Sequence, residues 1–127
     1  MIQDNDQKEA AQYNLAKQAM DIRKKELDAE KQKQVERLNQ TWDNLTEEQR
    51  EQLKQDQTDW FEKRDIDCKV LAQKSAHEIP EKEKETYQKQ SDYWDQALND
   101  QNTEMQYTKC FNQRTIERIV YLNNVFN

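Results

Sequence analysis

Apolar residues in the first third of the chain recur at the spacing of a helix. The clearest run, at intervals of three, four and three residues, is Val35, Leu38, Trp42 and Leu45. This is the spacing of a coiled-coil seam. The surrounding segment is rich in Ala, Glu, Lys, Gln and Leu and contains no helix breaker, so we expect a helix over about 4–43. Because the periodicity is weaker before Leu27, residues 1–26 are expected to form a less firmly packed arm.

A second helix is predicted to begin after this seam. Thr46 and Gln49 match a capping box, in which the hydroxyl accepts a hydrogen bond from the amide three residues on and the Gln side chain reaches back. The helix is expected over about 47–76 and should end before Pro80, because the residue preceding a proline disfavours helical backbone. Its apolar stripe is predicted to hold Leu53, Trp60, Cys68 and Leu71.

Two more helices are predicted in the remainder of the chain. Pro80 is a favoured first helical residue, so a third helix is expected over 80–99. The polar residues 99–102 predict a turn, and Thr103 begins a second capping-box pattern. A fourth helix is therefore expected over 103–125. Its inward face is predicted to hold Cys110, Ile116, Ile119, Val120 and Leu122.

The composition supports an all-α fold. The 127 residues include no Gly and a single Pro, so the residues that tight hairpin turns use are almost absent. Apolar residues are 33% of the chain and charged residues 36%, which leaves material for only a thin core. We predict a single domain, residues 1–127, folded as an elongated antiparallel bundle of about four helices.

The two cysteines, Cys68 and Cys110, are expected to form a disulfide. The alternatives are a free buried pair and half of a metal site, and a zinc site is disfavoured because it takes four ligands and the chain has one His. We assume that the third helix runs antiparallel to the second from a turn near Glu78, and that the fourth runs antiparallel to the third, in the same direction as the second. The two cysteines then lie at the same height along the bundle within about one helical turn. The crosslink would contribute roughly 4 kcal/mol to stability.

The charge balance bears on possible partners. The chain carries 26 acidic and 20 basic residues, a net charge of −6. No nucleic-acid partner is expected, because phosphates need clustered Lys or Arg and the chain has no such block. A basic protein partner would be attracted. The alternative is that the acidic surface serves solubility alone.

The expected location of the chain is tied to the expected disulfide, because no export signal is visible in the sequence. No apolar run approaches the roughly 20 residues that span a bilayer, and the N-terminus has neither the basic nor the apolar block of a signal peptide. We interpret the chain as a mature form whose export signal was removed, located in the periplasm or secreted, where disulfides persist. In a cytosolic chain the two cysteines would instead stay reduced.

No catalytic apparatus is recognisable in the sequence. The single histidine, His77, lacks the second His of a zinc-protease helix, so no metal site is predicted. A chain without Gly has no phosphate-binding loop, and no combination of Ser, His and acid is evident. The many carboxylates are interpreted as a solvated surface rather than as a hydrolase pair. We therefore expect a binding protein that is not an enzyme and takes no cofactor.

A polar stripe on the predicted second helix has two interpretations. Gln57, Trp60, Arg64 and Cys68 are spaced by three, four and four residues, so they share one face. A buried Arg64 needs a carboxylate or backbone carbonyls, so the stripe can be a structural pairing that fixes helix register. Alternatively, Arg64 or Arg118 reaches a groove that grips a ligand.

The same stripe resembles the signature of a known family. The segment QTDWFEKRDIDC, Gln57 to Cys68, is similar to that of the LprI-like lysozyme-inhibitor N-terminal domain family, which has a Gln, a Trp, an Arg-Asp pair and a Cys at these spacings. The segment LNQTWDNL is similar to the family's Leu-Asn-x-x-aromatic motif. The matched positions are Leu38, Asn39, Trp42, Gln57, Trp60, Arg64, Asp65, Cys68, Cys110, Thr115, Arg118 and Leu122.

The resemblance implies an exported helical domain with a Cys68–Cys110 disulfide. The family's name further implies inhibition of lysozyme or another peptidoglycan hydrolase by non-covalent occlusion. Lysozymes are often strongly basic, so an acidic partner would gain encounter rate and complementarity. The alternative function is an envelope structural or assembly module, in which the seam from Tyr13 to Leu45 pairs with itself or with another helix.

Overall fold

Three long helices make up the part of the chain that the structure describes. The computed structural model describes the backbone of residues 2–77 and 96–127, and side chains over 14–74 and 99–127. The helices are α1 (Ile2–Asn44), α2 (Glu47–His77) and α4 (Gln96–Asn124), and these ranges contain no strand. The expected all-α fold is confirmed there. The expected count of four helices is not, because most of 80–99 lies outside the described residues.

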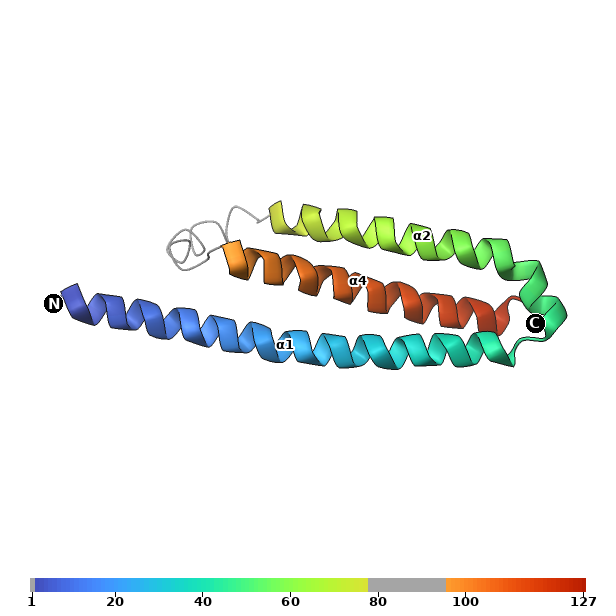
Figure 1. Ribbon diagram of the computed structural model, residues 1–127, viewed down its shortest axis with the longest axis horizontal. Coiled ribbons are helices and arrows are strands. Elements are labelled where there is room, and N and C mark those ends of the chain that lie inside the picture. The colour runs from blue at the N-terminus through green and yellow to red at the C-terminus, as the bar shows by residue number, and fades with distance from the viewer. Residues whose placement is uncertain (1, 78–95) are drawn as a thin grey trace.

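The helices form a flat, elongated arrangement in which α4 lies between α1 and α2 (Figure 1). α1 and α2 are antiparallel, and α4 runs back along both, antiparallel to α2 and parallel to α1. The expectation that the last helix climbs alongside α2 in the same direction is therefore wrong. α1 also continues beyond the N-terminal end of α4, so that its first turns project from the bundle (Figure 1).

The turn between α1 and α2 is fixed by the predicted capping box. The Thr46 amide donates to Gln49 Oε1 at 3.0 Å, and the Gln49 amide donates to Thr46 Oγ1 at 3.1 Å. Arg50 adds a hydrogen bond from Nη1 to the carbonyl oxygen of Asp43, at 3.2 Å. These bonds satisfy donors that the start of α2 would otherwise leave unpaired, which confirms a short turn between the helices.

The predicted turn at residues 99–102 is wrong, because α4 begins at Gln96. Thr103 does not cap the helix; its hydroxyl donates to the carbonyl oxygen of Asn99, 3.0 Å away, inside the helix. Intrinsic preferences of Asn and Asp against helix amount to only a few tenths of a kcal/mol per residue. Gln101 gains a hydrogen bond to Asp21 of α1 at 2.6 Å, a tertiary contact that favours continuing the helix.

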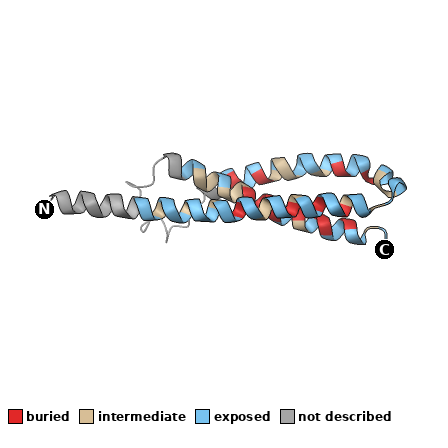
Figure 2. Cartoon of the chain, turned by 60° about the horizontal axis from the view of Figure 1, so that its bottom comes forward, coloured by how far each residue is buried: buried red, intermediate tan, exposed pale blue. Residues whose placement is uncertain are grey.

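The apolar core lies near the α1–α2 turn. It is built from Leu38 of α1, Leu53 of α2, and Ile119 and Leu122 of α4. Partly buried hydrophobic residues packed against it are Trp42, Leu45, Trp60 and Val125. Figure 2 shows the buried positions along the inner faces of the helices. Burial of these side chains stabilises the fold by roughly 25 cal/mol per Å² of apolar surface removed from water.

Two residues that were expected to point inward are exposed. Leu71 is 45% exposed and Val120 is 58% exposed. On α2 the buried positions near the disulfide follow a spacing of four, through Cys68 and Ala72, which leaves Leu71 off the stripe. On α4, Ile119 and Leu122 already occupy the inward face, and Val120 lies about 100° around the helix from Ile119.

The disulfide between Cys68 and Cys110 is confirmed. It joins α2 to α4 with 5.4 Å between the alpha carbons, across a sequence separation of 42 residues. Cys68 is completely buried. The pairing was predicted correctly although the helix direction used to argue for it was wrong, because the two cysteines also face each other when α4 runs antiparallel to α2.

Candidate functional site

The residues of the α2 stripe meet their partners on α4. Arg118 Nε donates to Gln57 Oε1 at 2.8 Å, and its Nη2 forms an ion pair with Asp56 Oδ2 at 2.6 Å. The guanidinium also lies 5.4 Å from the centroid of the Trp60 ring. Both Arg118 and Gln57 are buried. The charged pair that the structural interpretation of the stripe expects at Arg64 is therefore found at Arg118 instead.

Arg64 has a different environment from Arg118. Its Nη1 donates to Thr115 Oγ1 at 3.0 Å, and its guanidinium carbon lies 3.7 Å from the Phe111 ring centroid. The Trp60 and Phe61 rings are 4.7 and 5.1 Å away. In the described part of the chain Arg64 forms no ion pair, and its buried Nε has no hydrogen-bond partner. Burial lowers the pKa of Arg64.

A second cation contacts the same phenylalanine from α1. The ammonium of Lys31 lies 4.8 Å from the Phe111 ring centroid. Among the described residues Lys31 has no ion-pair partner either. Phe111 is itself buried, so two cations from opposite helices are held by one aromatic ring on the helix between them. Such cation–π contacts contribute about 0.5–2 kcal/mol each.

Asp65, which follows Arg64 in the sequence, forms polar contacts with Tyr107 and Lys69. Tyr107 Oη of α4 donates to Asp65 Oδ1 at 2.7 Å, and Lys69 contacts Asp65 Oδ2 at 2.9 Å. These hydrogen bonds hold the pKa of Asp65 below its ordinary value. Burial, together with the hydrogen bond to Asp65, raises the pKa of Tyr107 to about 12. Both shifts favour the state in which the phenol keeps its proton and the carboxylate is ionised.

The structure brings most of the signature positions together. Gln57, Trp60, Arg64 and Cys68 of α2 face Cys110, Thr115 and Arg118 of α4. Leu38 and Leu122 lie in the core, with Trp42 packed against it. Asn39 is exposed on α1 and is not brought into this cluster. The signature therefore coincides largely with the α2–α4 contact.

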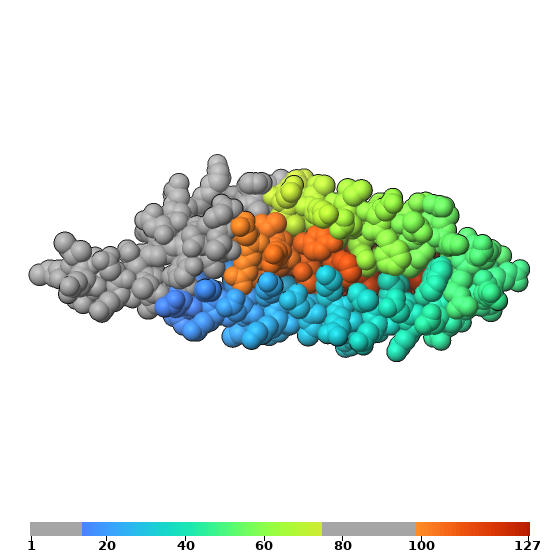
Figure 3. Space-filling model, in the orientation of Figure 1, coloured from blue at the N-terminus to red at the C-terminus, as the bar shows by residue number. Residues whose placement is uncertain are grey.

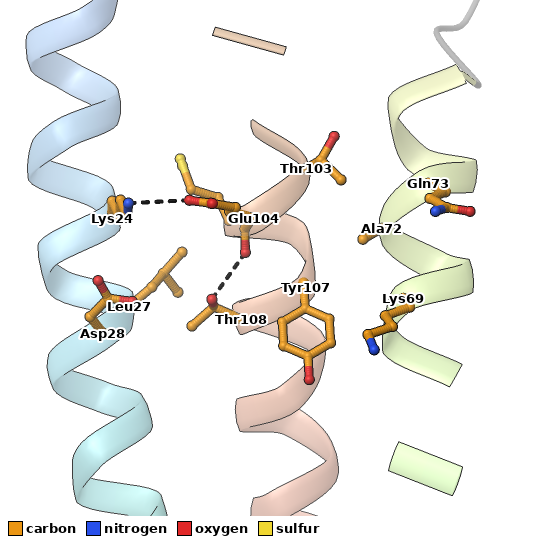
Figure 4. A pocket seen from close by; sticks show the side chains of 11 residues that line it. Lys24, Leu27, Asp28, Lys69, Ala72, Gln73, Thr103, Glu104, Tyr107 and Thr108 are labelled. Carbon is orange, nitrogen blue, oxygen red and sulfur yellow. Dashed lines mark hydrogen bonds and ion pairs between the residues drawn. The ribbon is translucent and has the colours of Figure 1, made fainter. Parts of the chain in front are cut away.

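A cavity of about 320 Å³ (Figure 4) lies about one helical turn away from Phe111 and the two cations that contact its ring, Lys31 and Arg64. Figure 4 shows Leu27 on α1, Ala72 on α2 and Thr108 on α4 among the residues that surround it. Ion pairs between Lys24 and Glu104 at 3.2 Å, and between Lys69 and Asp65 at 2.9 Å, stand at its edges. The lining residues are Lys24, Leu27, Asp28, Lys69, Ala72, Gln73, Thr103, Glu104, Met105, Tyr107 and Thr108.

The outer face of α2 is a second candidate surface. Its exposed carboxylates, none of which forms an ion pair within the described ranges, are Glu48, Glu51, Asp59 and Glu62. Ile66 and Val70 follow them and are among the exposed large hydrophobic residues. The spacing of these six residues places them on the side of α2 turned away from α4. We call this set the outer α2 face.

Several of these residues escaped the sequence-based prediction. Three of them contact signature residues directly: Asp56, Tyr107 and Phe111. The fourth, Lys31, contacts the same Phe111 ring as Arg64. Asp56 and Phe111 stand next to or near predicted positions, but their role depends on which helix faces which. The sequence offered one indirect signal for Asp56, namely that a buried arginine needs an acidic partner. That expectation concerned Arg64, whereas Asp56 pairs with Arg118.

The described residues also bear on two kinds of feature, a metal site and a membrane-spanning helix. Over these ranges no group of three or more His, Cys, Asp or Glu side chains could hold a metal ion. Within the same part of the chain, no helix has both the length and the apolar character needed to cross a membrane. Neither observation identifies a partner.

The chain was compared with protein-family models, with curated proteins and with solved structures, and none of the three comparisons gives a match.

Proposed function

We propose that this chain is an exported protein-binding module that captures a basic, lysozyme-like peptidoglycan hydrolase without covalent chemistry. The outer α2 face is the observation that supports this proposal. It combines four carboxylates that form no ion pair among the described residues with the exposed side chains of Ile66 and Val70. A basic protein would be drawn by the carboxylates, and the apolar pair would supply the desolvated centre of the contact.

The signature residues support this function indirectly. Because Gln57, Arg118 and the disulfide are used in holding α2 against α4, they build the scaffold on which the outer α2 face is displayed. A rigid helix presents side chains without the entropy cost of ordering a loop. On this proposal, occlusion of the hydrolase results from docking of a helix rather than insertion of a loop.

The test is inhibition of wall lysis by the purified, oxidised protein in the presence of a basic lysozyme. We expect association that weakens as salt rises, because the Debye length shrinks from about 10 Å at 0.1 M to about 3 Å at 1 M. Glu62→Gln should slow association. Glu36→Gln is the matched control, since Glu36 is an exposed glutamate of α1 without a described ion-pair partner. Absence of binding at low salt would contradict the proposal.

A second candidate function is helix association within the envelope. α1 projects past the start of α4 (Figure 1), and Leu15 and Ile22 are both exposed on it at a spacing of seven residues. Residues seven apart lie on one face and form the repeat of a coiled-coil seam. Sedimentation at micromolar concentration distinguishes the two functions. A dimer that Leu15→Ser and Ile22→Ser dissociate would support assembly, whereas a strict monomer would exclude self-association through this face.

A further inference from the structure

The cavity of about 320 Å³ is walled by all three described helices (Figure 4). Leu27 of α1, Ala72 of α2 and Thr108 of α4 are buried and belong to its lining. Figure 3 shows the side chains of the first turns of α4 as a strip between α1 and α2. Because the side chains of Ala72 and Thr108 are small, the space between the helices at this level is left unfilled.

The hydroxyl groups of the lining already donate to acceptors of the protein. The hydroxyls of Thr103 and Thr108 each donate to the carbonyl oxygen four residues earlier in α4, at 3.0 Å in both cases. Tyr107 Oη donates to Asp65 Oδ1 at 2.7 Å. Since a hydroxyl has one hydrogen to donate, these three groups leave no free hydroxyl donor in the lining for a ligand.

The charged groups of the lining balance one another. The lining contains two lysines, Lys24 and Lys69, and two carboxylates, Asp28 and Glu104. Lys24 pairs with Glu104 at 3.2 Å, and the charge of the exposed Asp28 also acts on Lys24. Lys69 pairs with Asp65 at 2.9 Å. The wall therefore carries no excess of either sign, and a charged ligand would lose its hydration without gaining a free partner of opposite charge.

Two side chains of the lining favour an aromatic ligand. Met105 and Tyr107 both border the cavity. A thioether sulfur makes favourable contacts with aromatic rings, and two rings attract each other in tilted or offset arrangements. The volume of about 320 Å³ is at the lower end of the range for small-molecule sites, and an apolar cavity of about 150 Å³ is large enough to bind benzene. The cavity therefore has room for one or two rings.

We propose that this cavity binds a neutral aromatic molecule of one or two rings. The rings contact Leu27, Ala72 and Met105, and the ligand forms no ion pair with the charged groups at the edges of the cavity. The cavity lies on the side of α2 that faces α4, opposite the outer α2 face. This site is therefore independent of the proposed capture of a hydrolase.

Nuclear magnetic resonance titration of the oxidised full chain with naphthalene tests the proposal. We expect saturable shifts of the methyl signals of Leu27, Ala72 and Met105, which line the cavity. The methyl signals of Leu53 and Leu122, in the core near the α1–α2 turn, should not move. Absence of saturable shifts at the three lining residues would overturn the site.

Charged relatives of naphthalene test the class of ligand. 2-Naphthoate and 2-naphthylmethylammonium carry the same two rings with a negative and a positive charge. Each should bind at least about ten-fold more weakly than naphthalene, because its charge has to lose water at a wall that offers no free counter-charge. A charged compound that binds as tightly as naphthalene would contradict the neutral class.

Substitutions locate the site. Ala72→Leu adds side-chain volume inside the cavity and should weaken naphthalene binding at least about ten-fold. Ala29→Leu is the matched control, because Ala29 is exposed on α1 and does not line the cavity. Met105→Ala removes the thioether contact from a partly buried position and should weaken binding about three-fold or more, which provides a test without added bulk. Unchanged affinity in both Ala72→Leu and Met105→Ala would contradict the proposed site.

Discussion

The two ends of the bundle are stabilised in different ways. At the turn end, formed by residues 38–60 and 115–125, a cluster of Leu and Ile residues is buried and the capping box closes the chain. At the other end, formed by 14–31, 64–74 and 99–112 and here called the open end, a disulfide joins α2 to α4, Leu27, Ala72 and Phe111 are buried, and exposed ion pairs stand beside a cavity. Exposed ion pairs contribute little, typically below about 1 kcal/mol. We expect the disulfide to contribute more to the stability of the open end than these ion pairs do.

This difference relates stability to function. A well-packed core leaves no space for a ligand, whereas the open end keeps a cavity. The disulfide supplies cohesion there without filling the space. We infer that the turn end determines the fold and that the open end is available for binding.

Removal of the disulfide should have the largest effect. Cys68→Ser with Cys110→Ser releases a crosslink spanning 42 residues, and we expect a loss of about 4 kcal/mol in the free energy of unfolding. Chemical denaturation of the oxidised protein and the double variant measures it. Hydrogen exchange should rise more at residues 64–74 and 99–112 than at 115–122. Equal acceleration at both ends would show that the disulfide stabilises the two ends alike.

Truncation in the core should cost somewhat less. Leu122→Ala removes a side chain that is 2% exposed and packs between Leu38, Leu53 and Ile119, so we expect a loss of about 3 kcal/mol. Leu71→Ala is the matched control, because Leu71 is exposed and its truncation should change stability by less than about 0.5 kcal/mol. Thermal unfolding of both variants measures the difference. Similar losses would mean that Leu71 is buried in solution.

The buried arginine at the turn end provides a third test. Arg118→Gln leaves the buried Gln57 amide oxygen without its donor and Asp56 without its ion pair, and should cost about 2 kcal/mol. Arg114→Gln removes an equal charge whose partner, Glu117, is an exposed neighbour on the same helix, and should be close to neutral. Denaturation midpoints measure both. A neutral Arg118→Gln would show that the pairing does not fix the helices.

The sequence predicted what local patterns determine. The bounds of α2 and the Thr46–Gln49 capping box follow from short-range chemistry and are confirmed. The turn at 99–102 failed because weak local preferences were outweighed by contacts of Gln101 and Glu104 with α1. The direction of α4 failed for a related reason, since the sequence contains no local signal for which helix a distant segment will pack against.

In the candidate site, too, local patterns were predictable from the sequence and contacts between distant segments were not. The α2 stripe was recognised because its members share one face, and the structure places Gln57 and Arg64 against α4 as that pattern indicates. Which acid serves which arginine was not predictable, because Asp56 pairs with Arg118 across 62 residues of sequence. Lys31 and Phe111 carry no motif. Their role appears only once three helices are placed side by side.

The hydrogen bond between Tyr107 and Asp65 gives the smallest predicted effect. Tyr107→Phe removes the donor of the 2.7 Å bond at the open end and should cost about 1 kcal/mol near neutral pH. Because the folded pKa of Tyr107 is raised from 10.0 to about 12, its contribution is fully present below pH 10 and is lost as pH rises through about 12. Ultraviolet titration of tyrosinate in both proteins locates the shifted phenol.

The acid side of the same pair has the opposite sign. The folded pKa of Asp65 is lowered by its hydrogen bonds from Tyr107 and Lys69, so its contribution is present above the ordinary carboxyl pKa and is lost as pH falls through the folded value. Tyr107→Phe should therefore flatten the stability profile at both extremes while leaving the Leu122 core unaffected. A free energy of unfolding that still falls at alkaline pH as steeply in the variant as in the parent protein would show that another tyrosine causes the fall. The open end would then have a stabilising contact other than this one.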